Sequence, residues 1–335
     1  MNMHAMPVFY NKNMYKEDAP KNAKYPKDMN PGDSNIRWIK LYQNNDWVWI
    51  PVRLRKTDID YINKYWGACE DKSAPTLEKI HNKYYLRFSF TETVILSDTP
   101  IAEQIICAVD LGINTDAVCS IMKADGTILA RKFIDFTSDK DRMIHAMNRT
   151  RRKQSKYGPR SATSLWAYVK RLNNNRAKKT ASAIVEFAAQ NSVDVIVMEH
   201  LDFKCCKKRG SKAQKLSMWN HGAIRKCVEQ KAHLRGIRIA TICAWKTSAL
   251  AFDGSGSVTR DDNNHALATF TTGKQYNCDL SASYNIGARY FIRELLKSLS
   301  ATEESRVKAK VPDVGRRTSC TLSTLRALVK ELSAA

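Results

Sequence analysis

Residues 106–121, ICAVDLGINTDAVCSI, place a carboxylate at the end of one apolar run and start a second apolar run after a glycine turn. The runs are short and bounded by turn residues, which predicts two buried strands joined at Gly112. Asp110 then ends the first strand. In that position it could hold a metal ion, receive a nucleotide or only cap the turn. Features elsewhere in the sequence are needed to distinguish these three roles.

The chain is strongly basic. Its 335 residues carry 55 Lys and Arg against 33 Asp and Glu, a formal net charge of +22. A polyanion relieves such self-repulsion, so nucleic acid is the expected partner. No apolar run approaches the roughly 18 residues that span a bilayer, so no membrane partner is expected. The nine cysteines include no C-x-x-C motif, and the N-terminus has no signal-peptide pattern. A location in the reducing cytoplasm is therefore expected.

Composition divides the chain into four parts. Residues 1–35 are polar and predict an irregular lead-in, whereas 36–100 contain short alternating runs typical of an antiparallel, β-rich domain. Residues 101–298 mix strand and helix patterns, and 299–335 predict a basic tail made of a linker and one short helix. Five aromatic residues of the β-rich part could stack on bases or fill its core: Trp38, Trp47, Trp49, Tyr84 and Tyr85.

A basic helical insertion is predicted over residues 137–190, with a break at Gly158 and Pro159. From Arg142 to Val185 there are 12 Lys and Arg and no acid. Solvated helix faces usually interleave both signs, so this block favours phosphate contacts. A second basic loop follows residue 203. The candidate nucleic-acid contacts are Arg149, Arg151, Arg152, Lys153, Lys156, Arg160, Lys170, Arg171, Arg176, Lys178, Lys179, Lys207, Lys208 and Arg209.

The expected order of elements from residue 101 is three strands, a helical insertion, a strand, a helix, a strand and a helix. This is the order of an RNase H-like α/β domain, in which the first strand is central and the fourth lies parallel beside it. Residues 247–277 interrupt the order as a long polar loop. Three acids stand at element ends, Asp110, Glu199 and Asp279, and in this fold they would surround one small space.

A cluster of three carboxylates needs a compensating cation, because like charges raise one another's pKa. Mg²⁺ or Mn²⁺ suits hard oxygen ligands, and a pair of such ions is used in phosphodiester hydrolysis. Each acid also has a simpler interpretation. Asp110 could stabilise the turn, Glu199 could face solvent, and Asp279 could be a helix N-cap.

Three stretches resemble the RuvC motifs of TnpB (OrfB) proteins, insertion-sequence nucleases related to type V CRISPR effectors: AVDLGINTDAVCSI, VIVMEHL and CDLSASYNIGAR. The resemblance covers roughly residues 36–298. It implies a RuvC-like nuclease domain, a wedge-like domain before it, and Asp110, Glu199 and Asp279 as the catalytic, metal-binding triad. It also implies RNA-guided DNA cleavage, with guide RNA from the transposon end and target DNA as partners, in a prokaryotic, nucleoid-associated protein.

The sequence departs from the family pattern in three places. Ala251 and Gly254 stand where cysteines of the family's zinc ribbon would fall, so no zinc is predicted. The third motif usually reads Asp-x-Asn-Ala-Ala, whereas here Ser281 and Ser283 follow Asp279. The region before the first motif is short, which implies a reduced wedge-like domain.

Two other functions remain open at this stage. One is a guide-RNA-dependent DNA-binding protein with weak or no catalysis. The other is a phosphotransferase of the actin and sugar-kinase type, whose first phosphate loop is similar to VDLGINTDAV. A kinase would leave Glu199 and the basic block unexplained.

Overall fold

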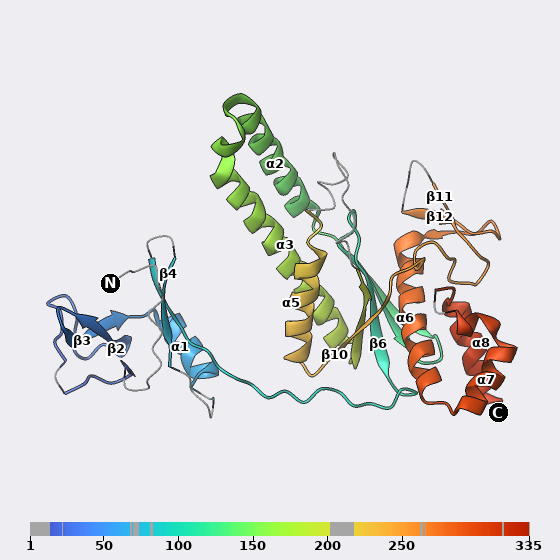
Figure 1. The fold of residues 1–335 in the computed structure, drawn as a ribbon, viewed down its shortest axis with the longest axis horizontal. Helices are drawn as coiled ribbons and strands as arrows, with labels where there is room; N and C mark the ends of the chain where they lie inside the picture. Colours follow the sequence, from blue (N-terminus) through green and yellow to red (C-terminus); the bar gives the residue numbers. More distant parts are fainter. Residues whose placement is uncertain are drawn as a thin grey trace. The chain divides into compact units, whose positions relative to one another are not determined.

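The structure is a computed structural model that describes residues 14–21, 23–67, 69, 74–80, 83–201, 218–261, 264, 266–316 and 318–334 (Figure 1). The chain forms two compact units that divide between Thr93 and Val94, and each is described by itself. In this part of the chain, no helix is long and apolar enough to cross a membrane.

The first unit contains the antiparallel strands that its alternating sequence predicts. Strands β1 (Tyr15–Lys16), β2 (Ile36–Gln43) and β3 (Asp46–Arg53) form one sheet, and β4 (Thr76–Ile80) pairs with β5 (Lys83–Arg87) in another. Positive φ angles at Asn44 (51°) and Asn45 (60°) turn β2 into β3, as two-residue hairpins require.

The first unit also contains helix α1 (Lys56–Tyr65), which the strand-based prediction missed. Its buried residues Ile59 and Ile62, followed by Trp66, are spaced three and four apart, which is a helical period. The five aromatic residues that the sequence singles out differ in burial. Trp38 is 1% exposed and belongs to the interior, whereas Tyr84 is 51% exposed.

The second unit is built on a five-stranded sheet in the order β10-β9-β6-β7-β8. The strands are β6 (Ile105–Asp110), β7 (Ala117–Lys123), β8 (Ile128–Ile134), β9 (Val195–His200) and β10 (Arg238–Cys243). β6, β7 and β8 are antiparallel neighbours, whereas β9 runs parallel to β6 and β10 runs parallel to β9. The predicted RNase H-like α/β fold is confirmed, with the first strand central and the fourth parallel beside it.

Helices cover both faces of this sheet. One face packs against α3 (Thr163–Gln190) and α5 (His221–His233), and the other packs against α6 (Cys278–Lys297). Figure 1 shows α3 lying beside α2 (Thr137–Tyr157) as a long pair that extends beyond the sheet. A 3-10 turn over Pro159–Ala162 separates α2 from α3, where the sequence indicates a break.

The C-terminal segment is not the linker and single short helix that its composition predicts. It forms α7 (Ala301–Lys310), a 3-10 turn (Pro312–Gly315) and α8 (Leu322–Ser333), and their apolar residues join the core around α6. Arg289 of α6 fastens this segment by donating to the carbonyls of Thr318 (2.8 Å) and Cys320 (3.2 Å). α6 is therefore buried on nearly all sides, because the sheet and this segment enclose it.

Residues 247–277 also differ from the predicted polar loop. They contain a small antiparallel sheet of β11 (Thr259–Arg260), β12 (Leu267–Thr269) and β13 (Gln275–Asn277). An apolar cluster fixes this sheet, with the Phe252 ring 5.6 Å from that of Phe270 and 5.0 Å from that of Tyr276. Ala251, where a ribbon cysteine would fall, is fully buried in the cluster. The sequence pattern did not predict these strands, because each has only two or three residues.

Asp194 joins the start of β9 to the segment that leads into β6. Its carboxylate accepts hydrogen bonds from Ser97 Oγ (2.6 Å), Thr99 Oγ1 (2.6 Å) and the Ile105 amide (2.9 Å). Burial raises the pKa of Asp194, but these hydrogen bonds outweigh it and hold the pKa below its usual value.

The lowered pKa of Asp194 gives stability that is present above the unfolded-state pKa, about 4, and is lost as pH falls through the lower folded-state pKa. We expect Asp194→Asn to reduce the free energy of unfolding at pH 7 by about 1–2 kcal/mol. The free energy of unfolding of this variant should also change less with pH under acidic conditions. Urea unfolding between pH 3 and pH 7 measures both. Asp98→Asn, at an exposed neighbouring position, is the matched control and should behave as the wild type.

Candidate active site

The alternation of side chains along β6 and β9 determines where their terminal acids lie. Ile106 and Ala108 of β6 pack in the core on the α6 face, whereas Cys107 and Val109 pack in the core with α3 and α5. Side chains two apart share a face, so Asp110 continues the α6 face. Glu199 does the same, because Val195 and Val197 belong to the α6 core.

The parallel register places these two acids side by side. Val109 is opposite Met198 in the β6–β9 pair, so Asp110 and Glu199 occupy the next position on neighbouring strands. Gly112 allows the chain to leave β6 sharply, because a Cβ there would lie 2.5 Å from the Thr115 carbonyl oxygen. The turn thus follows Asp110 directly.

Asp279 enters the same region from the first turn of α6. Asn277 is the N-cap of this helix, and its Oδ1 accepts a hydrogen bond from the Leu280 amide at 2.9 Å. The interpretation of Asp279 as an ordinary N-cap is therefore wrong. Gly287, two turns further along α6, lets the helix approach the sheet closely, since a Cβ there would lie 3.3 Å from the Ala108 Cβ.

The three carboxylates interact electrostatically. Burial raises the pKa of Asp110 well above its usual range, and the charges of Glu199 and Asp279 raise it further. Burial also raises the pKa of Glu199 and that of Asp279. Asp110 thus lies within electrostatic reach of both Glu199 and Asp279, on the α6 side of the sheet.

Arg260 is a residue of this site that the sequence analysis did not identify. Its charge opposes the raised pKa of Asp110 and that of Asp279, so it lies within electrostatic reach of both carboxylates. It belongs to β11, in the small sheet whose strands are too short to predict. No local pattern distinguishes it from other arginines of this basic chain.

Glu199 is oriented from the loop after β10. Thr247 Oγ1 donates a hydrogen bond to Glu199 Oε1, and Thr247 is only 3% exposed. Asn285 of α6 holds this loop by donating from Nδ2 to the carbonyls of Thr247 (3.0 Å) and Leu250 (2.9 Å). The helix that carries Asp279 therefore also fixes the partner of Glu199.

Thr247→Val is expected to lower the rate of any metal-dependent reaction at this site by about 10-fold or more, because partners of metal ligands typically contribute that much. The loss should appear mainly as a higher Mg²⁺ concentration for half-maximal rate. Thr247→Ser keeps the hydroxyl and should restore the wild-type value. Equal Mg²⁺ dependence in Thr247→Val and the wild type would show that this hydrogen bond does not orient Glu199.

The donor set suits a hard divalent cation. Three carboxylates supply oxygen ligands only, which Mg²⁺ and Mn²⁺ prefer. Burial and then the charges of Glu199 and Asp279 raise the pKa of Asp110, and a bound cation would oppose both effects. Among the described residues, no group of three or more His, Cys, Asp or Glu side chains is already arranged to hold a metal ion.

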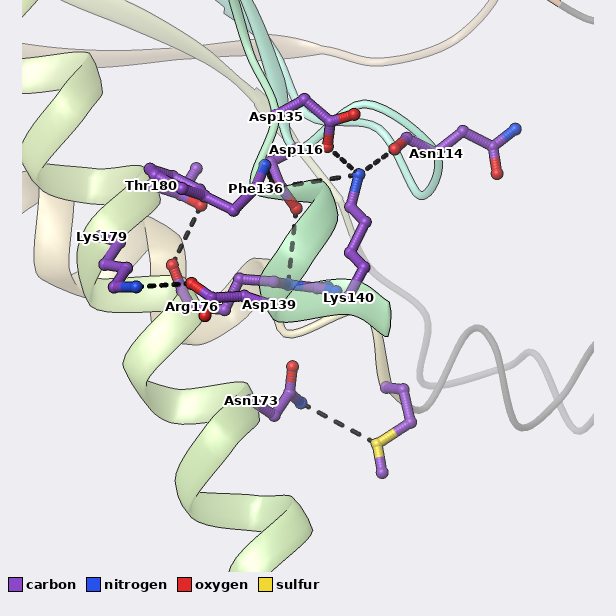
Figure 2. A network of polar contacts seen from close by, with 11 residues as sticks. Asn114, Asp116, Asp135, Phe136, Asp139, Lys140, Asn173, Arg176, Lys179 and Thr180 are labelled. Atoms are coloured by element: carbon purple, nitrogen blue, oxygen red, sulfur yellow. Dashed lines mark hydrogen bonds and ion pairs between the residues drawn. The ribbon is translucent and has the colours of Figure 1, made fainter. Parts of the chain in front are cut away.

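A buried ion-pair network connects the turn after Asp110 to the helical insertion (Figure 2). Asp116 is 2% exposed and accepts a hydrogen bond from the Phe136 amide at 2.9 Å. Its carboxylate lies 3.4 Å from Arg176 Nε of α3 and 3.8 Å from Lys140 Nζ of α2. Asp116 has no role predicted from the sequence, although it lies only six residues from Asp110.

The predicted nucleic-acid contacts fall into three groups. Arg176 is buried beside Asp116, and Lys179 Nζ lies 2.6 Å from Asp139. Lys207, Lys208 and Arg209 lie outside the described residues. The others are exposed on α2, α3 or the turn between them: Arg149, Arg151, Arg152, Lys153, Lys156, Arg160, Lys170, Arg171 and Lys178.

No family model and no curated protein matches the sequence. Among solved structures, the chain is similar to a Cas12f1–sgRNA–target DNA complex, with 17% identity over 63% of this chain and 55% of that chain, and a TM-score of 0.42. It is also similar to CasPhi-2 (Cas12j) bound to crRNA, with 12% identity over 80% and 64% of the two chains and a TM-score of 0.47.

A third similar structure is Thermus thermophilus RuvC, with 10% identity over 69% of this chain and 97% of that chain, and a TM-score of 0.27. The chain spans 55% and 59% of the two Cas12f structures that it matches. The assignment of the RNase H-like fold rests on the strand order and directions given above.

Proposed function

We propose that the protein is an RNA-guided DNA endonuclease of the TnpB type. Asp110, Glu199 and Asp279 would form the site at which it hydrolyses phosphodiester bonds. The observation that carries this proposal is the placement of these acids on the α6 side of an RNase H-like sheet, where burial and then the charges of Glu199 and Asp279 raise the pKa of Asp110. A fold needs no such repulsive cluster for its stability, so the cluster is better explained by a bound cation.

Mg²⁺ or Mn²⁺ held by the three acids would stabilise the negative charge that develops on the phosphodiester oxygens during cleavage. The protein's own residues prepare the site. Thr247 orients Glu199 through its hydroxyl, and Arg260 contributes a positive charge beside Asp110 and Asp279.

The guide would be an RNA from the transposon end, and base pairing between it and the target DNA would supply the sequence specificity. The exposed cations of α2 and α3 support this part of the proposal, since residues 142–185 carry 12 cations and no acid, which suits a phosphate backbone. Arg176 is left out of the proposed surface because its guanidinium is buried beside Asp116.

The test begins with the RNA that copurifies with the protein. Sequencing should find one species with a fixed scaffold and a variable end, and changing that end should redirect cleavage to the matching DNA. Cleavage should require Mg²⁺ or Mn²⁺ and stop on chelation. Bulk cellular RNA and no directed cleavage would overturn the proposal, whereas directed binding without cleavage in Mg²⁺ would indicate the catalytically inactive, guide-dependent DNA-binding protein.

A further inference from the structure

A groove in the first unit is lined mainly by aromatic side chains. It has a volume of about 450 Å³ and lies between α1, β5 and the segment that follows β5. The aromatic side chains that line it are Tyr61, Tyr65, Trp66, Tyr84, Tyr85, Phe88 and Phe90. Arg55 and Asp58, also in the groove, neutralise each other at 2.9 Å.

The outer rings of this groove are not needed to fill the core. Tyr61 is 61% exposed, Tyr84 is 51% exposed and Phe90 is 38% exposed, whereas Trp66 is 6% exposed and packs with the core. Several large exposed aromatic side chains gathered in one groove indicate a binding surface rather than a structural role.

The rings form a short row. The centroids of Tyr61 and Tyr65 are 4.5 Å apart with a tilt of 47° between the rings, and those of Tyr65 and Phe90 are 5.4 Å apart and stacked at 25°. Tyr61 and Tyr65 are four residues apart on α1, so they lie on the same face of the helix. The exposed Tyr61 ring at one end of this row offers a surface on which a flat, aromatic ligand can stack.

Lysines accompany the rings. Lys64 Nζ lies 5.0 Å from the Tyr65 centroid, and Lys79 Nζ lies 5.5 Å from the Tyr84 centroid. Aromatic faces with cations beside them match the alternation of bases and phosphates in a single strand. A proline-rich peptide also fits aromatic grooves, but it supplies no anion for these lysines.

We propose that this aromatic groove binds unpaired bases of an RNA. Unpaired bases are a feature of RNA loops and ends, whereas the bases of duplex DNA are already stacked and inaccessible. The proposal goes beyond the acidic site of the second unit and does not depend on DNA cleavage.

The test compares two dye-labelled RNAs of equal length, one with bases and one abasic, by fluorescence anisotropy with the full chain freed of bound RNA. The wild type should prefer the RNA with bases, and Tyr61→Ala should reduce this preference by about fivefold or more. Tyr61→Phe keeps the ring and should leave the preference unchanged. The salt dependence should be the same in all three proteins, because no phosphate contact is removed.

Tyr42→Ala is the matched control, since Tyr42 is 47% exposed in the same unit but lies outside the groove. It should behave as the wild type. The proposal is overturned by an equal loss in Tyr42→Ala, by a wild-type preference in Tyr61→Ala, or by single-stranded DNA or a proline-rich peptide that competes as well as the RNA does. Failure of DNA cleavage in the wild type, with the Tyr61 effect intact, would overturn the nuclease proposal alone.

Discussion

Asp110→Asn is expected to reduce DNA cleavage by about three orders of magnitude or more, which corresponds to about 4 kcal/mol in the activation free energy. Asn has the size of Asp but cannot supply the charge that would hold a divalent cation. RNA binding should change by less than about twofold, because the exposed cations of α2 and α3 are untouched. Single-turnover cleavage with excess RNA-loaded protein and filter binding of the RNA measure the two quantities.

The stability of the variant separates a catalytic loss from a folding defect. Asp110 is repelled by Glu199 and Asp279 in the metal-free protein, so neutral Asn should leave the Tm unchanged or raise it. Asp98→Asn removes an exposed carboxylate outside the site and should cut DNA as the wild type does. Cleavage by Asp110→Asn at the rate of the Asp98 control would show that Asp110 is not part of a catalytic site.

The acidic cluster could be predicted because it follows from local rules. The alternation of apolar residues shows that Asp110 shares a face with Ala108, and that Glu199 shares a face with Val197. The order of the elements makes β6 and β9 parallel neighbours, so both acids reach the same place. Neither step requires knowledge of a distant contact.

The residues that the sequence missed depend on distant contacts. Asp116 pairs with Arg176, sixty positions later, and nothing in the local sequence separates Arg176 from the exposed cations around it. Arg260 reaches the site from a strand of two residues, which has no periodicity to detect. The C-terminal helices are likewise held by Arg289, whose partners are backbone carbonyls without a sequence signature.

Arg176→Met is expected to reduce the free energy of unfolding by about 3 kcal/mol, because it leaves the 2%-exposed Asp116 carboxylate without its guanidinium partner. Urea unfolding followed by circular dichroism measures the loss. Lys178→Met, at an exposed position of the same helix, should change stability by less than about 0.5 kcal/mol. The double variant Asp116→Asn/Arg176→Met removes both charges and should recover part of the loss, since the two residues are in direct contact.

The same variants decide whether Arg176 also contacts nucleic acid. A phosphate contact would give Arg176→Met a smaller salt dependence of RNA binding, lower by about one unit in the slope of log affinity against log salt. We expect no such change, because the guanidinium is engaged by Asp116 inside the protein. Lys170→Met and Arg171→Met, which remove exposed cations of α3, should each lower the slope. A lower slope in Arg176→Met with unchanged stability would show that Arg176 contacts a phosphate. It would also show that its ion pair with Asp116 does not stabilise the turn after Asp110.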